Sequence, residues 1–303
     1  MRTLRTVAEL RAALAGPRHA GRVIGLVPTM GAFHDGHLSL MARARQECDE
    51  VVVSLFVNPT QFEDPADLAG YRRDEHEDAR LAAAMGADHL FAPAREQVYP
   101  PGFATSVSVG AMSERLEGAQ RGRRHFDGVS TVVTKLLNMV APQVAYFGQK
   151  DVQQTIVIKR LVRDLDLPVR IEVCPTVREP DGLAMSSRNV RLSAAERTRA
   201  ESLHRALRAV QAAVAAGARD PAAARAGGVE ELARAGVTPE YLELVTADTL
   251  VPVERIEGNV LAVLAATVGS TRLIDNEMIR VRPSAHAVAN HERREALTCS
   301  ARC

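Results

Sequence analysis

Two histidines in a glycine-containing turn have a spacing that suits phosphate binding. His34 and His37 belong to the segment PTMGAFHDGH, which begins at Pro28 and joins an apolar run at 23–27 to a helical pattern that starts near Gly36. This three-residue spacing places both imidazoles on one side of a first helical turn, where they can donate hydrogen bonds to phosphate oxygens. Free N–H groups at a helix start attract the same anion. The alternatives are two surface histidines in a polar turn and, less favoured because no third ligand is near in the chain, a zinc site.

Amide side chains follow two other apolar runs. Asn58 and Gln61 come directly after the run SLFV, and Gln154 lies one helical turn beyond the sequence YFGQKD. Neutral amides at the carboxyl edge of a sheet suit the recognition of hydroxyl groups and of a carboxylate. For the Asn58–Gln61 segment taken alone, an ordinary polar turn after a strand is an equally good interpretation.

Cationic and hydroxyl side chains stand in two more turns. Lys150 precedes a helix start, where it can meet a phosphate, although a lysine in a glycine turn is more often only solvated and Asp151 serves equally well as a helix cap. Ser186, Ser187 and Arg188 in DGLAMSSRN can clamp a triphosphate and move with a lid. In isolation, that last segment fits an interdomain turn better.

Two charged clusters remain. The run RGRRH at 121–125 favours an anion contact over a solvated turn, because a glycine interrupts it. A second cluster is predicted to form a solvated helix face, with one of its acids as a candidate to help hold Mg²⁺; it comprises Asp74, Glu75, Glu77 and Asp78.

Composition excludes several classes of protein. Lys and Arg number 38 against 37 Asp and Glu, and this net charge of +1 is unlike that of a protein whose partner is a nucleic acid. No apolar run approaches the length of a membrane span, and the amino terminus lacks the pattern of a cleaved signal. The four cysteines are scattered without zinc-ligand spacing. We therefore expect a cytoplasmic protein with reduced thiols and no membrane or nucleic-acid partner.

The order of patterns predicts an α/β fold with a doubly wound, Rossmann-like parallel sheet and a smaller C-terminal α+β domain. The N-terminal 16 residues have the pattern of an amphipathic surface helix. Strands are expected at 23–27, 51–57, 88–92, 143–147 and 169–174, and helices at 36–47, 73–85, 129–139 and 152–165. The expected domains are residues 1–176 for nucleotide and substrate binding and 177–282 as a smaller lid, followed by a flexible tail at 283–303.

The second domain is expected to begin with helices and to end with strands. Ser193 and Glu196 have the spacing of a capping box at the start of an Ala/Arg-rich helical region. Pro221 and the Gly227-Gly228 pair are predicted to divide that region. Short strands are expected at 241–245, 259–266 and 271–274.

Taken together, the segments PTMGAFHDGH, FVNPTQF, HFDGVSTVVTKL, YFGQKDVQQ and DGLAMSSRN resemble the pantothenate synthetase (pantoate–β-alanine ligase) family, within the nucleotidyltransferase-like group that carries HxGH signatures. The resemblance is dense over residues 23–192 and looser to Asn276. It implies an ATP-dependent, AMP-forming ligase: ATP and (R)-pantoate give pantoyl adenylate and pyrophosphate, and β-alanine then gives pantothenate and AMP. It also implies a need for Mg²⁺ and a homodimer.

The resemblance further implies roles for individual residues. His37, as the acid, together with His34, Lys150 and Arg188 are the catalytic candidates, and Gln61 and Gln154, with Asn58 nearby, are the candidates for pantoate binding. No metal ligand is assigned. The candidates for ATP binding are Met30, Gly31, Ala32, Phe33, His34, Asp35, Gly36, His37, Gly148, Gln149, Lys150, Asp151, Val177, Met185, Ser186, Ser187 and Arg188.

Two positions depart from the family pattern, and other functions remain as alternatives. Asp35 stands where the family more often has Glu, and Asp127 where it often has a basic or small residue. Another HxGH nucleotidyltransferase, acting on a different small acid or on a phosphate ester, would not need the amide pair Gln61 and Gln154. A non-catalytic nucleotide-binding module would be expected to lack Lys150 or His37. A dehydrogenase is excluded because no strand is followed by G-x-G-x-x-G.

Overall fold

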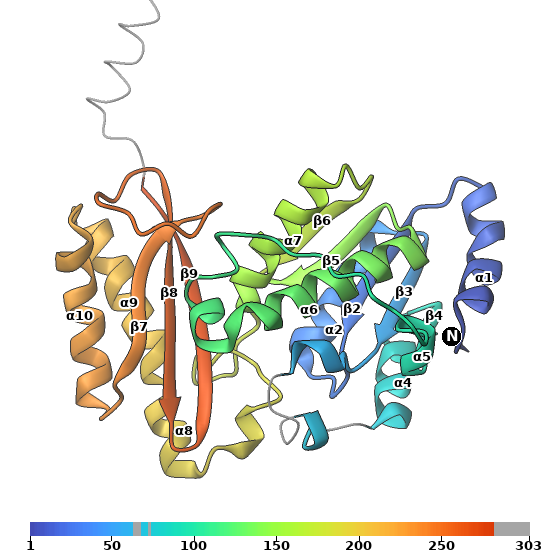
Figure 1. Ribbon diagram of the computed structural model, residues 1–303. Helices are drawn as coiled ribbons and strands as arrows, with labels where there is room; N and C mark the ends of the chain where they lie inside the picture. Colours follow the sequence, from blue (N-terminus) through green and yellow to red (C-terminus); the bar gives the residue numbers. More distant parts are fainter. Residues whose placement is uncertain (63–67, 72–73, 282–303) are drawn as a thin grey trace, which may run out of the picture.

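A six-stranded, all-parallel sheet forms the larger part of the computed structural model, which describes residues 1–62, 68–71 and 74–281. Its strands lie in the order β1-β4-β3-β2-β5-β6 (Figure 1). They are β1 (Arg2–Leu4), β2 (Ile24–Thr29), β3 (Glu50–Leu55), β4 (His89–Phe91), β5 (Val144–Gly148) and β6 (Arg170–Cys174). After β2, the chain adds β3 and β4 on one side of that strand, and then β5 and β6 on its other side. The topological switch point therefore lies between β2 and β5.

Helices cover both faces of this sheet, as the predicted doubly wound fold requires. Successive residues of one strand point to opposite faces: Leu26 of β2 packs in the cluster with α1 and α6, while Val27 packs in the cluster with α2 and α4. The helices around this sheet are α1 (Val7–His19), α2 (Asp35–Glu47), α4 (Glu75–Ala84), α5 (Arg95–Val98), α6 (Glu117–Val140) and α7 (Val152–Asp164), with short 3₁₀ turns η1 (Pro59–Gln61) and η2 (Gln149–Asp151).

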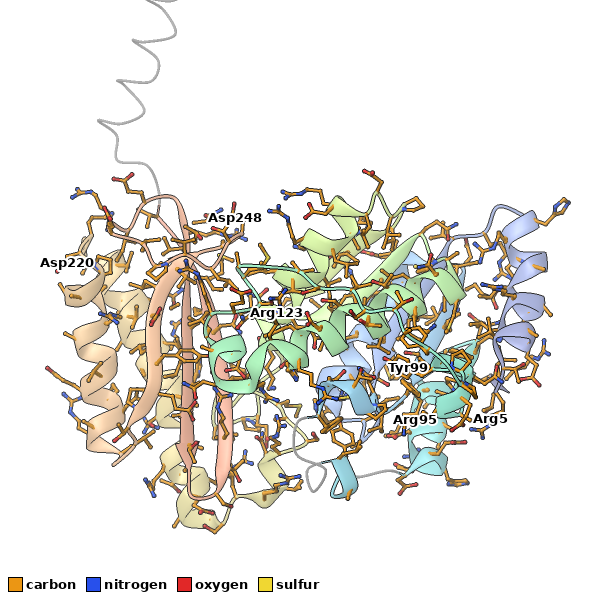
Figure 2. The ribbon with its side chains drawn as sticks, viewed as in Figure 1. Arg5, Arg95, Tyr99, Arg123, Asp220 and Asp248 are labelled. Atoms are coloured by element: carbon orange, nitrogen blue, oxygen red, sulfur yellow. The ribbon has the colours of Figure 1, made fainter. Side chains whose placement is uncertain are left out.

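The C-terminal part is a three-stranded antiparallel sheet with helices on one face (Figure 2). Its strands β7 (Pro239–Thr246), β8 (Asn259–Val268) and β9 (Thr271–Arg280) are hydrogen-bonded in that order. The 3₁₀ turn η3 (Asn189–Arg191) leads into α8 (Ala194–Ala200), which has the predicted capping box, and then into α9 (Ser202–Ala215) and α10 (Pro221–Arg234).

The two faces of this small sheet pack on different partners. Leu264 of β8 packs with the helices α9 and α10, whereas Leu261 and Val263 pack with Val152 and Ile156 of α7. The small sheet is therefore held against the larger domain next to the ends of β5 and α6, on the left in Figure 1. The predicted fold class is confirmed.

The amino terminus was predicted wrongly in one respect. Residues 2–4 form the edge strand β1, which pairs in parallel with β4, and α1 begins only at Val7, after Thr6 closes a capping box with Glu9. A three-residue strand is too short to show a period of two, so the helical pattern that follows it dominated the interpretation.

The Gly227-Gly228 pair does not divide the helical region as predicted, because both residues lie inside α10. A Cβ on Gly228 would come within 2.9 Å of the Ala206 carbonyl oxygen, so this glycine lets α10 approach α9 closely. Pro221 is confirmed as a boundary, since it opens α10.

The glycine pair provides a matched test of this packing. Gly228→Ala is expected to destabilise the protein by about 1–3 kcal/mol through overpacking. Gly227→Ala is expected to be neutral or to stabilise by up to about 1 kcal/mol, because its Cβ would meet only Ala209 at 3.8 Å and alanine favours a helix. Chemical denaturation of both variants measures the difference; equal effects would contradict the close approach.

The predicted flexible tail at 283–303, with Cys299 and Cys303, lies outside the described residues.

Cys48 and Cys174 are buried, and both are free thiols, as the sequence predicts. Within the described ranges, no helix is long and apolar enough to cross a membrane.

Candidate active site

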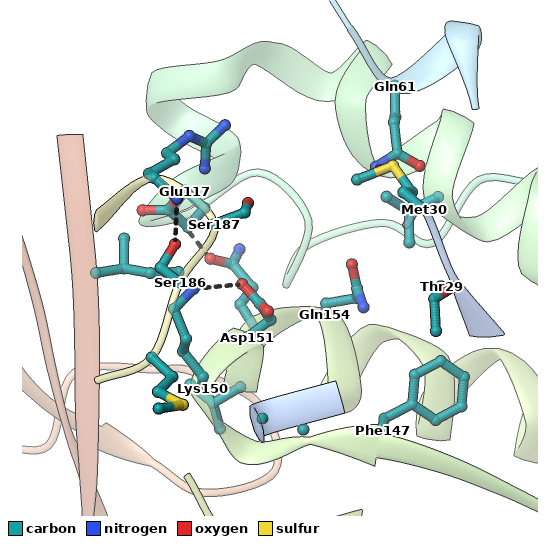
Figure 3. Close-up of a pocket in the computed structure, with 18 of the residues that line it drawn as sticks. Thr29, Met30, Gln61, Glu117, Phe147, Lys150, Asp151, Gln154, Ser186 and Ser187 are labelled. Atoms are coloured by element: carbon teal, nitrogen blue, oxygen red, sulfur yellow. Dashed lines mark hydrogen bonds and ion pairs between the residues drawn. The ribbon is translucent and has the colours of Figure 1, made fainter. Parts of the chain in front are cut away.

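A cavity of about 630 Å³ opens at the carboxyl ends of β2 and β5, next to the switch point of the parallel sheet. Its walls come from the turns after these strands, from η1, from α6 as far as Leu136, from the loop at 175–191 and from β9. In Figure 3, Lys150 and the serines lie on one side of the cavity and Gln61 with Met30 on the other, with Asp151 and Gln154 between them. Ligands of open α/β sheets bind at such a position.

The turn after β2 is shaped by a buried acid on α4. Asp78 is 2 % exposed and accepts hydrogen bonds from the N–H groups of Ala32 (3.0 Å) and Phe33 (2.8 Å). Gly31 has φ +95°, and a Cβ there would lie 2.8 Å from an Asp78 carboxylate oxygen, so the turn requires glycine. The prediction that Asp78 belongs to a solvated helix face is therefore wrong: its side chain holds the turn that leads to the histidines.

His34 and His37 face each other at the start of α2, with ring centroids 4.2 Å apart. The Gly36 N–H donates to His34 Nδ1 (3.2 Å), and the His34 N–H donates to His37 Nδ1 (3.4 Å). Because each Nδ1 accepts a hydrogen bond, the neutral rings carry their protons on Nε2. Both line the cavity.

Burial keeps both imidazoles neutral. Burial, followed by the neighbouring His34, lowers the pKa of His37 to about 3, and burial together with Lys150 lowers the pKa of His34. In the free protein the pair consequently offers two neutral Nε2–H donors. The acid role that the resemblance implies for His37 would therefore need a bound polyanion to raise this pKa again.

A pH titration of stability tests the burial of His37. The unfolded chain takes up this proton below about pH 6.5, whereas the folded protein does so only near pH 3. His37 therefore contributes stability that is complete above pH 6.5 and is lost as the pH falls towards 3. Between pH 7 and pH 4.5, His37→Gln is expected to lose roughly 2 kcal/mol less stability than the wild type in urea unfolding. A surface variant, His19→Gln, is the control, and an identical loss in His37→Gln and the wild type would contradict the assignment.

Three amide side chains line the cavity, but only two of them keep hydrogen-bonding groups for a ligand. Asn58 is 1 % exposed, and its Nδ2 donates to Gln61 Oε1 (2.9 Å) and to the Gly128 carbonyl (3.1 Å). Its Oδ1 accepts from Thr60 and from the Tyr99 hydroxyl (2.8 Å), so its hydrogen-bonding capacity is used inside the protein.

Gln61 and Gln154 are the amides that remain for a ligand. Gln61 Nε2 points at the Met30 sulfur (3.3 Å), which is a weak acceptor. Within the described part of the chain, the Gln154 side chain has no hydrogen-bond partner and lines the cavity. The neighbouring wall is apolar, with Phe56, Val129, Val132, Val133, Leu136 and Phe147.

The turn after β5 is held by β9 of the small sheet. Asn276 donates from Nδ2 to the carbonyls of Gln149 and Lys150 (both 3.0 Å) and accepts from Gln149 Nε2 (3.0 Å). Lys150 lines the cavity, and its Nζ lies 3.7 Å from Asp151 Oδ1. Gln149 is thus occupied in holding the turn, while Lys150 and Asp151 face the cavity.

The two serines directly follow a small hairpin whose arms pair at Arg178 and Ala184 and whose turn lies at 180–182. The Met185 N–H donates to the Val177 carbonyl (3.0 Å), and Arg178 binds Asp275 of β9 through two hydrogen bonds of 2.6 and 3.0 Å. The hairpin is therefore anchored to the small sheet, and its open end, at Val177 and Met185, lines the cavity together with Ser186 to Arg188.

The structure brings most of the predicted site residues to one cavity. Those that line it are Met30, Ala32, His34, Gly36, His37, Asn58, Gln61, Gly148, Lys150, Asp151, Gln154, Val177, Met185, Ser186, Ser187 and Arg188. Gly31, Phe33, Asp35 and Gln149 do not line it and instead build the surrounding turns.

Sequence reasoning missed several residues that support the site. Besides Asp78 and Asn276, Gln153 is 4 % exposed: its Nε2 donates to the carbonyls of Met112 (2.7 Å) and Arg115 (2.8 Å). Of the adjacent glutamines in DVQQ, one therefore uses its amide to hold the start of α6, and the other keeps its amide for the cavity. The period of the helix could have separated them, because adjacent residues point about 100° apart. No local signal marks Asn276 or Asp78 as partners of turns so distant in the chain.

No group of three or more His, Cys, Asp or Glu side chains that could hold a metal ion occurs among the residues described. The zinc interpretation of His34 and His37 therefore gains no third ligand.

Comparisons with known proteins agree on one family. A sequence model described as pantoate-β-alanine ligase matches residues 2–278. The pantothenate synthetase of Cereibacter sphaeroides is 55% identical over 273 residues, which cover 90% of this chain and 98% of that protein. The pantothenate synthetase of Moorella thermoacetica is 51% identical, with 93% and 99% covered.

Solved structures give the same result. The crystal structure of pantothenate synthetase from Thermus thermophilus superposes with a TM-score of 0.87 at 47% identity, covering 91% of this chain and 99% of that one. The pantoate-β-alanine ligase of Francisella tularensis, solved in complex with β-γ ATP and β-alanine, gives 0.75 at 33% identity, with 94% and 100% covered. With these matches over nearly its whole described length, the chain belongs to the pantoate–β-alanine ligase family.

Proposed function

We propose that this protein is an ATP-dependent ligase that condenses (R)-pantoate with β-alanine through pantoyl adenylate, releasing pyrophosphate and AMP. One observation carries the proposal: Gln61 and Gln154, whose amides keep hydrogen-bonding capacity for a ligand, share a cavity with the histidine pair and Lys150. The first group suits a small hydroxy acid, and the second suits a nucleoside triphosphate.

In the first step, a pantoate carboxylate oxygen attacks the α-phosphorus of ATP. The new O–P bond forms as the bond to the pyrophosphate oxygen breaks, and negative charge develops on the phosphate oxygens. The Nε2–H groups of His34 and His37 and the ammonium of Lys150 are placed to stabilise this charge. Ser186, Ser187 and Arg188 would hold the leaving pyrophosphate.

Mg²⁺ fits this site as a partner shared with the nucleotide. Asp151 lines the cavity beside Lys150 with half of its side chain exposed, whereas the carboxylates of Asp275 and Glu117 are paired with Arg178 and Arg272. A magnesium ion is commonly held by one or two carboxylates together with substrate phosphates, whose charge it neutralises. Asp151 is therefore the residue that we assign to it.

In the second step, the amine of β-alanine attacks the acyl carbon. The N–C bond forms, the C–O bond to the phosphate breaks, the nitrogen loses a proton and AMP leaves. This step needs an oriented and shielded acyl phosphate more than a strong base. The apolar wall formed by α6 suits the two methyl groups of pantoate and helps to exclude water.

The experiment that tests the function mixes purified protein with ATP, Mg²⁺ and pantoate and omits β-alanine. We expect pyrophosphate release in an amount close to that of the enzyme and a bound adenylate, followed by turnover when β-alanine is added. Without any pantoate-dependent signal, the substrate assignment fails and the alternative, a different HxGH nucleotidyltransferase, becomes the better interpretation.

The assembly is also a proposal. We infer a cytoplasmic homodimer in which residues 177–282 act as a lid over residues 1–176. The resemblance supports the dimer, and Val190, an apolar side chain that is 77 % exposed at the rim of the cavity, supports a closing lid. Light scattering of the purified protein should give twice the chain mass of 32.7 kDa.

A further inference from the structure

Asn189 directly follows residues 186–188, which we call the serine loop, and its buried side chain ties the two ends of this loop together. It is 7 % exposed, and its Nδ2 donates to the carbonyl oxygen of Ala184 (3.1 Å), just before the loop. Its backbone N–H donates to the carbonyl oxygen of Ser186 (3.0 Å), inside the loop. One residue thus closes the segment whose side chains line the cavity.

The same amide is bonded to an acid on the first arm of the hairpin. Asn189 Nδ2 donates to Glu179 Oε1 (2.7 Å), and the other oxygen of this carboxylate accepts from Arg197 of α8 (2.5 Å). Arg197 also donates to Asp181, in the turn of the hairpin, through Nε (2.8 Å) and a terminal nitrogen (2.6 Å). Arg197 therefore holds the Glu179 carboxylate in place for Asn189, and the three side chains link α8 to the serine loop.

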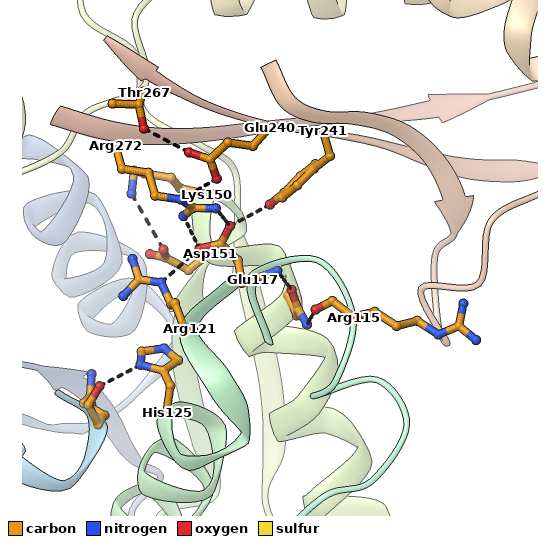
Figure 4. Close-up of polar contacts among 12 residues, drawn as sticks. Arg115, Glu117, Arg121, His125, Lys150, Asp151, Glu240, Tyr241, Thr267 and Arg272 are labelled. Atoms are coloured by element: carbon orange, nitrogen blue, oxygen red, sulfur yellow. Dashed lines mark hydrogen bonds and ion pairs between the residues drawn. The ribbon is translucent and has the colours of Figure 1, made fainter. Parts of the chain in front are cut away.

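The small sheet that carries the hairpin is fastened to the larger domain beside the cavity. Glu117, at the start of α6, accepts two hydrogen bonds from Arg272 of β9 and one from the Tyr241 hydroxyl of β7, all of 2.7 Å (Figure 4). Burial alone would raise the pKa of Glu117, but its contacts with Arg272 lower it to about 2, so this carboxylate is charged. Because Arg178 binds Asp275 of the same strand, β9 joins the hairpin to the larger domain.

The serine loop lies against the turn of Lys150. Ser186 and Arg188 share with Lys150 a narrow cavity of about 10 Å³, which Arg121 and Arg272 line as well. A space of this size holds about one water molecule, so the loop and Lys150 are close neighbours. Four cationic side chains meet here, and such a cluster suits the terminal phosphates, where a nucleoside triphosphate carries most of its charge.

We propose, on the basis of the function proposed above, that Asn189 is a positioning residue which, with Glu179 and Arg197, presets the serine loop for the terminal phosphates of ATP. Asn189 does not bind the nucleotide itself, because Ala184 and Glu179 use both protons of its Nδ2 and the residue does not line the main cavity. A preset loop loses less conformational freedom when the triphosphate binds, and it needs little reorganisation as charge develops on the leaving pyrophosphate.

The decisive experiment measures how Asn189→Asp binds ATP and AMP. Aspartate has the same shape, but it cannot donate, and its charge would face Glu179. In calorimetric titrations with Mg²⁺, the Kd for ATP should rise roughly 10–100-fold, whereas the Kd for AMP, which lacks the terminal phosphates, should stay within about 3-fold. Asn138→Asp is the matched control, because Asn138 is exposed on α6 and donates to the carbonyl oxygen of Thr134 (2.9 Å).

An exchange of partners separates positioning from a loss of stability. In the double variant Asn189→Asp/Glu179→Gln, the glutamine can donate to the aspartate through Nε2 and still accept from Arg197 through Oε1. The bond between positions 179 and 189 then runs in the reverse direction, and we expect ATP affinity to recover several-fold relative to Asn189→Asp. Glu179→Gln alone should weaken ATP binding, because it loses either the bond to Asn189 or the bond to Arg197.

The other outcomes overturn the proposal. An unchanged Kd for ATP in Asn189→Asp, or equal losses of ATP and AMP affinity, means that Asn189 does not position the serine loop for the phosphates. A lower thermal stability with an unchanged ratio of the two affinities assigns it a structural role only. Without recovery in the double variant, Glu179 has no part in positioning.

Two further arms keep the test decisive. If Asn189→Asp fails to fold, Arg197→Gln removes the support of Glu179 from the side of α8 and should raise the Kd for ATP several-fold while that for AMP stays unchanged. An unchanged ratio in this variant would overturn the proposal. If the wild-type protein releases no pyrophosphate in the presence of pantoate, the proposed function fails, whereas the comparison of ATP with AMP still decides the role of Asn189.

Discussion

Replacing Lys150 by alanine should lower the rate of adenylate formation by roughly 10²–10³-fold while the fold stays intact, the usual effect of losing one fixed transition-state donor. The backbone of Lys150 is fixed before substrate arrives, because Asn276 donates to the carbonyl oxygens of Gln149 and Lys150, on either side of the Lys150 Cα. Its charge thus needs little reorganisation when phosphate charge develops. Single-turnover measurement of pyrophosphate release with saturating ATP and pantoate gives the rate directly.

The same helix supplies a control for this experiment. Lys159→Ala removes an equivalent charge from the exposed side of α7 and should leave the rate unchanged. His37→Ala is expected to show a loss similar to that of Lys150→Ala, because it removes an Nε2–H donor from the same cavity. A near-wild-type rate in Lys150→Ala would remove this residue from the catalytic machinery.

Gly128→Ala is expected to weaken the proposed pantoate site at Gln61, although Gly128 itself does not line the cavity. A Cβ on Gly128 would lie 2.6 Å from the Thr60 carbonyl oxygen and 2.8 Å from the Gln61 nitrogen, and these backbone atoms cannot rotate away. We expect about 3 kcal/mol of destabilisation from overpacking and roughly a 10²-fold loss in kcat/KM for pantoate, because a displacement near 1 Å is enough for such a loss. Urea unfolding and exchange kinetics measure the two effects.

A control shows whether the effect of Gly128→Ala comes from the contact with the backbone of Thr60 and Gln61 or simply from an added methyl group in a helix. Gly227→Ala makes the same change in another helix, where the new Cβ meets only ordinary contacts, and should leave kcat/KM unchanged. If Gly128→Ala kept the wild-type KM for pantoate, Gln61 would not be held by the contact between η1 and α6.

The core elements of the fold could be predicted from local patterns. The apolar run at 51–57 became β3, buried on both faces, because a strand at the centre of a parallel sheet has no polar side. The capping box of Ser193 and Glu196 formed as predicted, since its hydrogen bonds span only three residues. Elements with a short or interrupted pattern were missed, as β1 and the undivided α10 illustrate.

The sequence by itself determined the chemical groups of the site. The order of strand, turn and helix around His37, Gln61, Lys150 and Gln154 is a local property, and the carboxyl ends of parallel strands must meet at one edge. For that reason the gathering of these residues in one cavity was foreseeable.

Only the tertiary structure decided which groups remain available to a ligand. The side chain of Asn58 uses its hydrogen bonds on Gly128 and Tyr99, and the carboxylate of Asp78 is buried against the turn at 31–33. Such pairings depend on contacts between distant segments, and hydrogen-bonding capacity is known only when every partner is in place. Residue types thus set what the site contains, and packing sets what it can still bind.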